Sequence, residues 1–264
     1  MANDLMPKDK KVKFSVALRT DAYKNLINET LGNQKVAQKF IAEISTVVAQ
    51  NNQLQECDAK TILSAGLLAQ TLNLPLAPAL GFAYIIPYNT KDGGKVAQFQ
   101  VSWKGLIQLA IRTGQYKSIG VRPVHDGEYK GQDEFGEDTF KFDHKFDEKK
   151  TVGYYAYFIL VNGFKKSIYW TKEQCESHAK RYSAEYRSKG TGKWKEMFDE
   201  MAMKTVLKQL ISKWGIMSVD MQTVVQADQS VINDDGTYDY VDNEPADEEP
   251  KKKTTVSNSI IPED

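Results

Sequence analysis

Polar side chains recur at regular intervals in the stretch QFQVSWKGLIQLAIRTGQ, which we expect to form a strand and then a helix. Alternate residues of a strand share a face, so Gln98, Gln100 and Ser102 would lie opposite the apolar side chains. Lys104 and Arg112 would lie two turns apart on one side of the helix. Donors without acidic neighbours in sequence suit a row of phosphates, although a solvated polar surface would show the same pattern.

A second basic region runs from 172 to 215 and contains ten Lys/Arg. Tyr182, Tyr186 and Trp194 are interleaved with these cations in KRYSAEYRSKGTGKWK. Cations that follow a phosphate backbone, together with rings on which bases stack, are typical of proteins that bind single strands without reading their sequence. Trp194 fits a helix core equally well, because large aromatic side chains serve both purposes.

These two regions, with the hairpin turn before the first and the residues that follow its helix, predict one set of nucleic-acid contacts. The candidate DNA-binding residues are Lys91, Lys95, Gln98, Gln100, Ser102, Lys104, Arg112, Lys117, Arg122, Lys180, Arg181, Arg187, Lys189, Lys193, Trp194, Lys204, Lys208 and Lys213.

The segment GTGKW, residues 190–194, contains half of a phosphate-binding loop. A complete loop needs an earlier glycine, a preceding buried strand and Ser or Thr directly after the lysine. Trp194 follows Lys193 here, and the preceding segment is polar and charged. ATP hydrolysis by this motif is therefore not expected.

Asp126, Glu128 and Lys130 have the residue types of a metal-dependent nuclease, in which carboxylates hold Mg²⁺ and a lysine polarises the phosphate. Their spacing in a glycine-containing loop makes a poor metal cage, and a solvated turn is the simpler interpretation. His125, His144 and His178 show no metal-ligand spacing. We expect no catalytic residue, no metal, no cofactor and no enzyme activity.

Charge is unevenly distributed along the 264 residues, although the net charge is zero. From Asp220 onward there are twelve Asp/Glu and three Lys, about −9 in total. The preceding 219 residues hold 32 Lys/Arg against 23 Asp/Glu, about +9. A basic body with an acidic tail is typical of a polyanion-binding protein with an interaction segment. We expect a domain over 1–225 and a disordered tail over 226–264 that recruits a partner.

Composition and cysteine usage predict an intracellular globular protein. The chain has no run of 18 apolar residues and no apolar segment near its first residue, so we expect neither secretion nor a membrane span. Cys57 and Cys175 show no metal or redox spacing and suit a reducing cytoplasm.

The element pattern predicts an α+β fold. Helical periodicity and capping residues indicate three helices before Pro75, and hairpin turns are expected at DGG and at Asn162-Gly163. Thr171 and Gln174 form a capping box for the next helix, and one long helix is expected from Lys193 to a stop at Gly215.

Several segments resemble the RecT family of phage-type single-strand annealing proteins, with matching order and spacing over about Lys35 to Met221. They are LNLPLAPALGFAYIIPYNT, AQFQVSWKGLIQLAIRTGQYKSI, GYYAYFILVNGFKKSIYWTKEQCESHAKRYS and MAMKTVLKQLISKWGIMS. The resemblance implies ATP-independent annealing of complementary strands for homologous recombination, and a small antiparallel sheet packed on a long helix.

The same resemblance implies homo-oligomeric rings or helical filaments on single-stranded DNA and on the annealed duplex. It also implies a 5′–3′ exonuclease and the host single-strand-binding protein as partners, in the bacterial cytoplasm. A protein that protects single strands without annealing them is the main alternative, and a Mg²⁺-dependent nuclease is the second.

Overall fold

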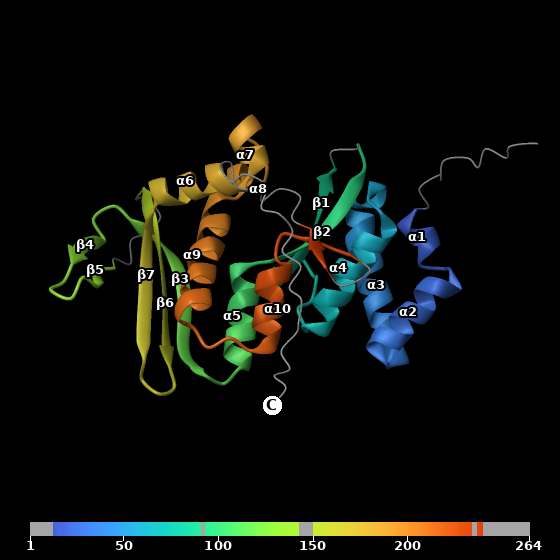
Figure 1. The fold of residues 1–264 in the computed structure, drawn as a ribbon, viewed down its shortest axis with the longest axis horizontal. Helices are drawn as coiled ribbons and strands as arrows, with labels where there is room; N and C mark the ends of the chain where they lie inside the picture. The colour runs from blue at the N-terminus through green and yellow to red at the C-terminus, as the bar shows by residue number, and fades with distance from the viewer. Residues whose placement is uncertain (1–12, 91–92, 143–149, 234–236, 240–264) are drawn as a thin grey trace, which may run out of the picture.

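The computed structural model describes residues 13–90, 93–142, 150–233 and 237–239. Figure 1 shows an elongated arrangement, with helices from the start of the chain at one end and a three-stranded sheet at the other. Every strand pairing among the described residues is antiparallel. The expected α+β class is therefore confirmed.

The first part of the chain is helical, as expected. Helix α2 ends at Gly32, whose φ of 59° is left-handed and favours glycine. The Asp58 side chain caps α4 by accepting a hydrogen bond from the Lys60 N–H group. The elements are α1 (Phe14–Ala17), α2 (Asp21–Leu31), α3 (Gln34–Gln50), the 3₁₀ helix η1 (Leu54–Glu56) and α4 (Ala59–Thr71).

A β-hairpin packs against α4 and leads into α5. The hairpin consists of β1 (Ala83–Asn89) and β2 (Lys95–Val101), and α5 (Trp103–Arg112) follows at once. The Ser102 hydroxyl caps α5 by accepting a hydrogen bond from the Gly105 N–H group. Strand β2 also bridges to Ser230 through Phe99, so the end of the described chain adds to the edge of this hairpin.

A second sheet has the strand order β3-β6-β7. Its strands are β3 (Tyr116–His125), β6 (Thr151–Leu160) and β7 (Lys165–Thr171), and the expected turn at Gly163 has a φ of 89°. A small hairpin of β4 (Tyr129–Gln132) and β5 (Asp138–Phe140) lies at the outer end of the molecule (Figure 1).

Helices after the second sheet contact both halves of the molecule, one containing the β1-β2 hairpin and the other the β3-β6-β7 sheet. They are α6 (Lys172–Tyr182), α7 (Ala184–Lys189), α8 (Lys193–Glu196), α9 (Phe198–Trp214) and α10 (Val219–Ala227), followed by β8 (Val231–Ile232) and β9 (Tyr238–Asp239). The predicted capping box at Thr171 is confirmed. The single helix expected from Lys193 to Gly215 is instead broken at Met197, where φ is −137°.

The long helix α9 packs against β3, β6 and β7, as the family resemblance implies. Its Val206, Leu207 and Leu210 side chains are fully buried in the same hydrophobic core as Phe99 and Phe158 of the two sheets. One continuous core therefore supports both halves of the molecule.

The folded body extends beyond the boundary expected at 225/226. Ala227, Asp228 and Ser230 are buried, and the Phe99 N–H group donates to the Ser230 carbonyl at 3.3 Å. The boundary predicted from the acidic composition lies too early in the chain, because Asp228 is buried within the folded body. Residues 240–264 lie outside the described residues, so disorder there stays a prediction.

Arg112 stabilises the end of α4. Its guanidinium donates to the Leu72 carbonyl at 2.8 Å and to the Asn73 carbonyl at 2.7 Å. Arg112→Ala should therefore lower the free energy of unfolding by about 1–3 kcal/mol, because two carbonyl groups lose charged donors. Lys104→Ala, which removes an exposed cation from the same helix, is the matched control in thermal unfolding. Equal melting temperatures for the two variants would contradict this role.

Candidate nucleic-acid interface

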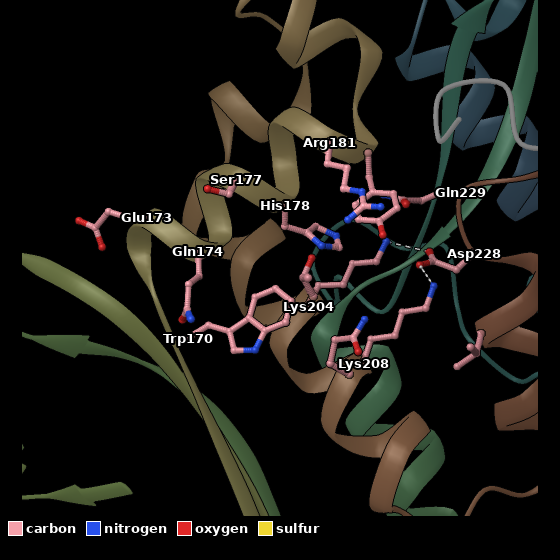
Figure 2. A pocket seen from close by; sticks show the side chains of 14 residues that line it. Trp170, Glu173, Gln174, Ser177, His178, Arg181, Lys204, Lys208, Asp228 and Gln229 are labelled. Carbon is pink, nitrogen blue, oxygen red and sulfur yellow. Dashed lines mark hydrogen bonds and ion pairs between the residues drawn. The ribbon is translucent and has the colours of Figure 1, made fainter. Parts of the chain in front are cut away.

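A groove of about 1180 Å³ lies between α6, α9 and the segment that links α10 to β8. Figure 2 shows Glu173 at one end of this groove and Asp228 and Gln229 at the other. The lining residues are Trp170, Glu173, Gln174, Ser177, His178, Arg181, Tyr182, Lys204, Thr205, Lys208, Gln209, Val225, Asp228 and Gln229.

The two helical walls follow from helix periodicity. Along α6, Gln174, His178 and Tyr182 recur every four residues and so face the groove together. Along α9, Lys204 and Lys208 are likewise one turn apart. The walls meet because β7 leads directly into α6, which crosses the end of the sheet on which α9 packs (Figure 1).

An aromatic row lines the α6 side of the groove. The His178 ring lies 5.6 Å from Trp170 and 4.5 Å from Tyr182, measured between ring centroids. Burial lowers the pKa of His178 to about 4, and the charges of Lys208 and Arg181 act in the same direction. The imidazole is therefore neutral at physiological pH, and the row presents uncharged rings.

A buried ion network forms the opposite end of the groove. The Asp228 carboxylate accepts hydrogen bonds from Lys204 Nζ at 2.7 Å and from Lys208 Nζ at 3.0 Å (Figure 2). Burial alone would raise the pKa of Asp228, but the two ammonium groups outweigh it and the pKa is lowered. Two ammonium groups around one carboxylate leave a surplus positive charge beside Arg181.

Three of the predicted contacts, Arg181, Lys204 and Lys208, meet at this groove. Lys204 is buried against Asp228, whereas Lys208 keeps 27% of its side chain exposed. Lys180 is exposed on α6 but does not line the groove. The sequence therefore located the cations of α6 and α9 but did not identify Asp228, which holds two of them.

The prediction of an exposed polar surface along β2 is wrong. Gln98 is fully buried and Gln100 is 5% exposed, with its amide donating to the Tyr88 hydroxyl. The hairpin is covered on both sides, because α4 packs against it and Gln98 lines a small space together with Trp194 and Gln229. Both amide atoms of Gln98 lack a hydrogen-bond partner among the described residues.

Other predicted contacts have partners within the protein. Lys95 pairs with Glu56 at 2.5 Å, Lys193 pairs with Glu196 at 2.7 Å, and Arg187 donates to the carbonyls that end α6. Ser102 and Arg112 stabilise helix ends, as described above. These contacts reduce the number of cations that are available to a ligand.

The remaining predicted contacts lie apart from the groove. Lys104 and Lys213 are exposed, each with its ammonium 5.4 Å from a tryptophan ring. Lys117 is exposed on β3, and Arg122 lies over the Phe142 ring. Lys91 and the side chain of Lys189 are outside the described residues.

Trp194, for which core and base contact were equal alternatives, is 6% exposed and packs edge-on against Phe198. Its ring leaves little surface on which a base could stack. Trp170, Gln174 and His178 were not among the predicted DNA contacts, although the four-residue spacing of Gln174, His178 and Tyr182 on α6 was a usable signal. The sequence alone did not show that α9 would face these residues across the groove.

The group of Asp126, Glu128 and Lys130 that was considered for a nuclease is not an open metal cage. Glu128 is 1% exposed, and its carboxylate accepts a hydrogen bond from the His125 N–H group at 2.8 Å. Arg122 lies 3.7 Å from the same carboxylate. Within the described ranges, no group of three or more His, Cys, Asp or Glu side chains is arranged to hold a metal ion.

A groove with cations on two helices and a row of neutral rings has the residue types of a single-strand-binding site. The RecT family model matches residues 38–249, and the chain belongs to the RecT family. Members of this family are single-strand annealing proteins of recombination. No helix in the described part of the chain is both long and apolar enough to cross a membrane.

Two curated relatives are similar over most of their length. An uncharacterized protein, YqaK of Bacillus subtilis strain 168, is 40% identical over 237 residues, which cover 88% of this chain and 79% of YqaK. Protein RecT of Escherichia coli strain K12 is 29% identical over 245 residues, which cover 83% of this chain and 85% of RecT.

The lowered pKa of His178 predicts a pH dependence of stability. Between about pH 4 and 6.5 the unfolded chain binds a proton at this residue that the folded protein does not, so the free energy of unfolding falls as pH decreases through that window. His178→Phe, which keeps a ring beside Trp170, should lose less melting temperature between pH 7 and pH 4.5 than the parent protein. Parallel pH profiles for the two proteins would contradict this assignment.

Proposed function

We propose that the protein binds single-stranded DNA in the groove between α6 and α9 and anneals a complementary strand there without ATP. The observation that carries the proposal is the meeting of Arg181 and Lys208 with the Trp170–His178–Tyr182 row in one open groove. The α6 wall supplies Arg181 and the rings of His178 and Tyr182, and the α9 wall adds Lys208 across the groove. Membership of the RecT family supports the same activity.

The proposed mechanism needs only geometry and charge. Arg181 and the exposed part of Lys208 neutralise phosphates of the first strand, which reduces the repulsion that a second strand meets. Stacking on the aromatic row holds the strand extended, and Watson–Crick pairing then selects the second strand. Annealing is downhill by itself, so no nucleotide hydrolysis is required.

Assembly and partners are part of the proposal. We infer that subunits form a ring or helical filament along the DNA, as the family resemblance implies. A 5′–3′ exonuclease would expose the single strands, and the host single-strand-binding protein would hand them over in the bacterial cytoplasm. The acidic segment 240–264 is proposed to recruit one of these partners.

Arg181→Ala and Lys208→Ala test the groove. Each variant should weaken binding of a labelled single strand and reduce the slope of log affinity against log salt by about 0.7, the contribution of one neutralised phosphate. Lys39→Ala, which removes an exposed cation from α3, distant in sequence from both groove helices, is the matched control. Affinities and slopes equal to those of the control would place the DNA elsewhere.

The same proteins separate annealing from protection. Two complementary oligonucleotides, one carrying a fluorophore and the other a quencher, are mixed without nucleotide. The parent protein should speed pairing beyond the rate of the naked strands, and both groove variants should lose most of that acceleration. A protein that binds both strands but slows their pairing would be a protector instead.

Two truncations test where the functional body ends. Removing 240–264, which carries seven Asp/Glu and three Lys, should leave annealing of naked strands intact. Removing 226–264 also deletes Asp228 and leaves Lys204 buried without its partner, which should destabilise the protein by about 3–5 kcal/mol. Loss of annealing after removal of 240–264 alone would show that annealing requires the acidic segment.

A further inference from the structure

Asp228 is bonded to both halves of the molecule. Its Oδ1 atom accepts hydrogen bonds from Lys204 Nζ at 2.7 Å and from the Val101 N–H group at 3.2 Å. Its Oδ2 atom accepts from Lys208 Nζ at 3.0 Å. The two lysines belong to α9, which packs on the three-stranded sheet, whereas Val101 ends β2 of the other half. One carboxylate therefore connects α9 to β2.

Backbone pairing holds this carboxylate in place. The Gln229 N–H group donates to the Phe99 carbonyl at 3.0 Å, and the Phe99 N–H group donates to the Ser230 carbonyl at 3.3 Å. The segment on which Asp228 lies is thus aligned along β2. Any displacement of Asp228 would have to break this pairing, so its position is well defined.

The two lysines have different surroundings. The Lys204 side chain is 6% exposed and its ammonium faces Asp228, whereas the Lys208 side chain is 27% exposed and reaches the groove. Lys204 therefore balances the buried carboxylate, and Lys208 supplies the charge that a ligand meets. A flexible lysine stem would otherwise place its ammonium in many positions.

We propose that Asp228 is a positioning residue for DNA, which holds the Lys208 ammonium at the groove. This inference rests on the proposed function of the groove. It predicts a change in DNA affinity opposite in sign to the change expected from simple electrostatics. Removing a negative charge beside a polyanion site should tighten binding, whereas removing a positioning carboxylate should weaken it.

The test replaces the buried pair together, because Asp228→Asn alone would leave Lys204 as an uncompensated buried charge. In the double variant Lys204→Met/Asp228→Asn, the asparagine oxygen still accepts from the Val101 N–H group, but Lys208 loses its charged partner. The double variant should fold and should bind a single strand about tenfold more weakly than the parent, a loss equivalent to one charge-assisted hydrogen bond. Glu29→Gln on α2 is the control for loss of a carboxylate far from the groove.

A double-mutant cycle with Lys208→Ala separates positioning from general stability. In the parent protein Lys208→Ala should weaken binding and lower the salt slope, whereas in the double variant it should change neither by a measurable amount. An undiminished effect of Lys208→Ala, or binding by the double variant as tight as that of the parent, would overturn the proposal. If Lys208→Ala and Arg181→Ala have no effect in the parent, the groove itself is not the DNA site and both proposals fail.

A second variant covers the case in which the double variant does not fold. Asp228→Glu keeps the charge but moves it by one methylene group, so Lys204 retains a partner while the Lys208 ammonium shifts. It should remain folded by circular dichroism and bind DNA more weakly than Glu29→Gln. Parent-like affinity together with a parent-like salt slope would show that the position of this carboxylate does not matter to DNA.

Discussion

The buried carboxylate of Asp228 is bonded to both halves of this protein. Asp228 receives two ammonium groups from α9 and one backbone N–H group from β2, so the sheet half and the hairpin half meet at its two oxygen atoms. Charges are costly to bury, and attraction compensates for that cost only when donors surround the acceptor closely. Here three donors do so, and two of them, Lys204 and Lys208, line the groove.

The fold around this network places most of the groove lining on the helices α6 and α9. α9 lies in the continuous core, so the packing of Val206 and Leu207 sets where the backbone of Lys204 and Lys208 lies. α6 begins at a capping box and is held across the end of the sheet. Rigid helical walls place cations and rings in a defined order, which suits a site that must hold an extended strand.

Internal hydrogen bonds and ion pairs occupy several other cations of the basic body. Arg112 holds the end of α4, Lys95 pairs with Glu56, and Arg187 caps α6. These residues contribute to the net positive charge of the body without facing a ligand. Long-range attraction of a polyanion uses the whole charge, whereas the contact itself depends on the few cations that the fold leaves accessible.

Local patterns in the sequence determined most of the secondary structure. The helices before Pro75, the hairpin turn at Gly163 and the capping box at Thr171 depend on neighbouring residues, so they could be predicted from the sequence alone. The sequence also located the basic residues Arg181 and Lys208. Tertiary packing decided which faces of these elements are buried. Gln98 is buried because α8 and the segment after α10 cover β2, and no short-range sequence pattern indicates that contact. For the same reason Asp228 looked like part of an acidic tail, although packing against α9, distant in sequence, makes it the internal partner of two lysines.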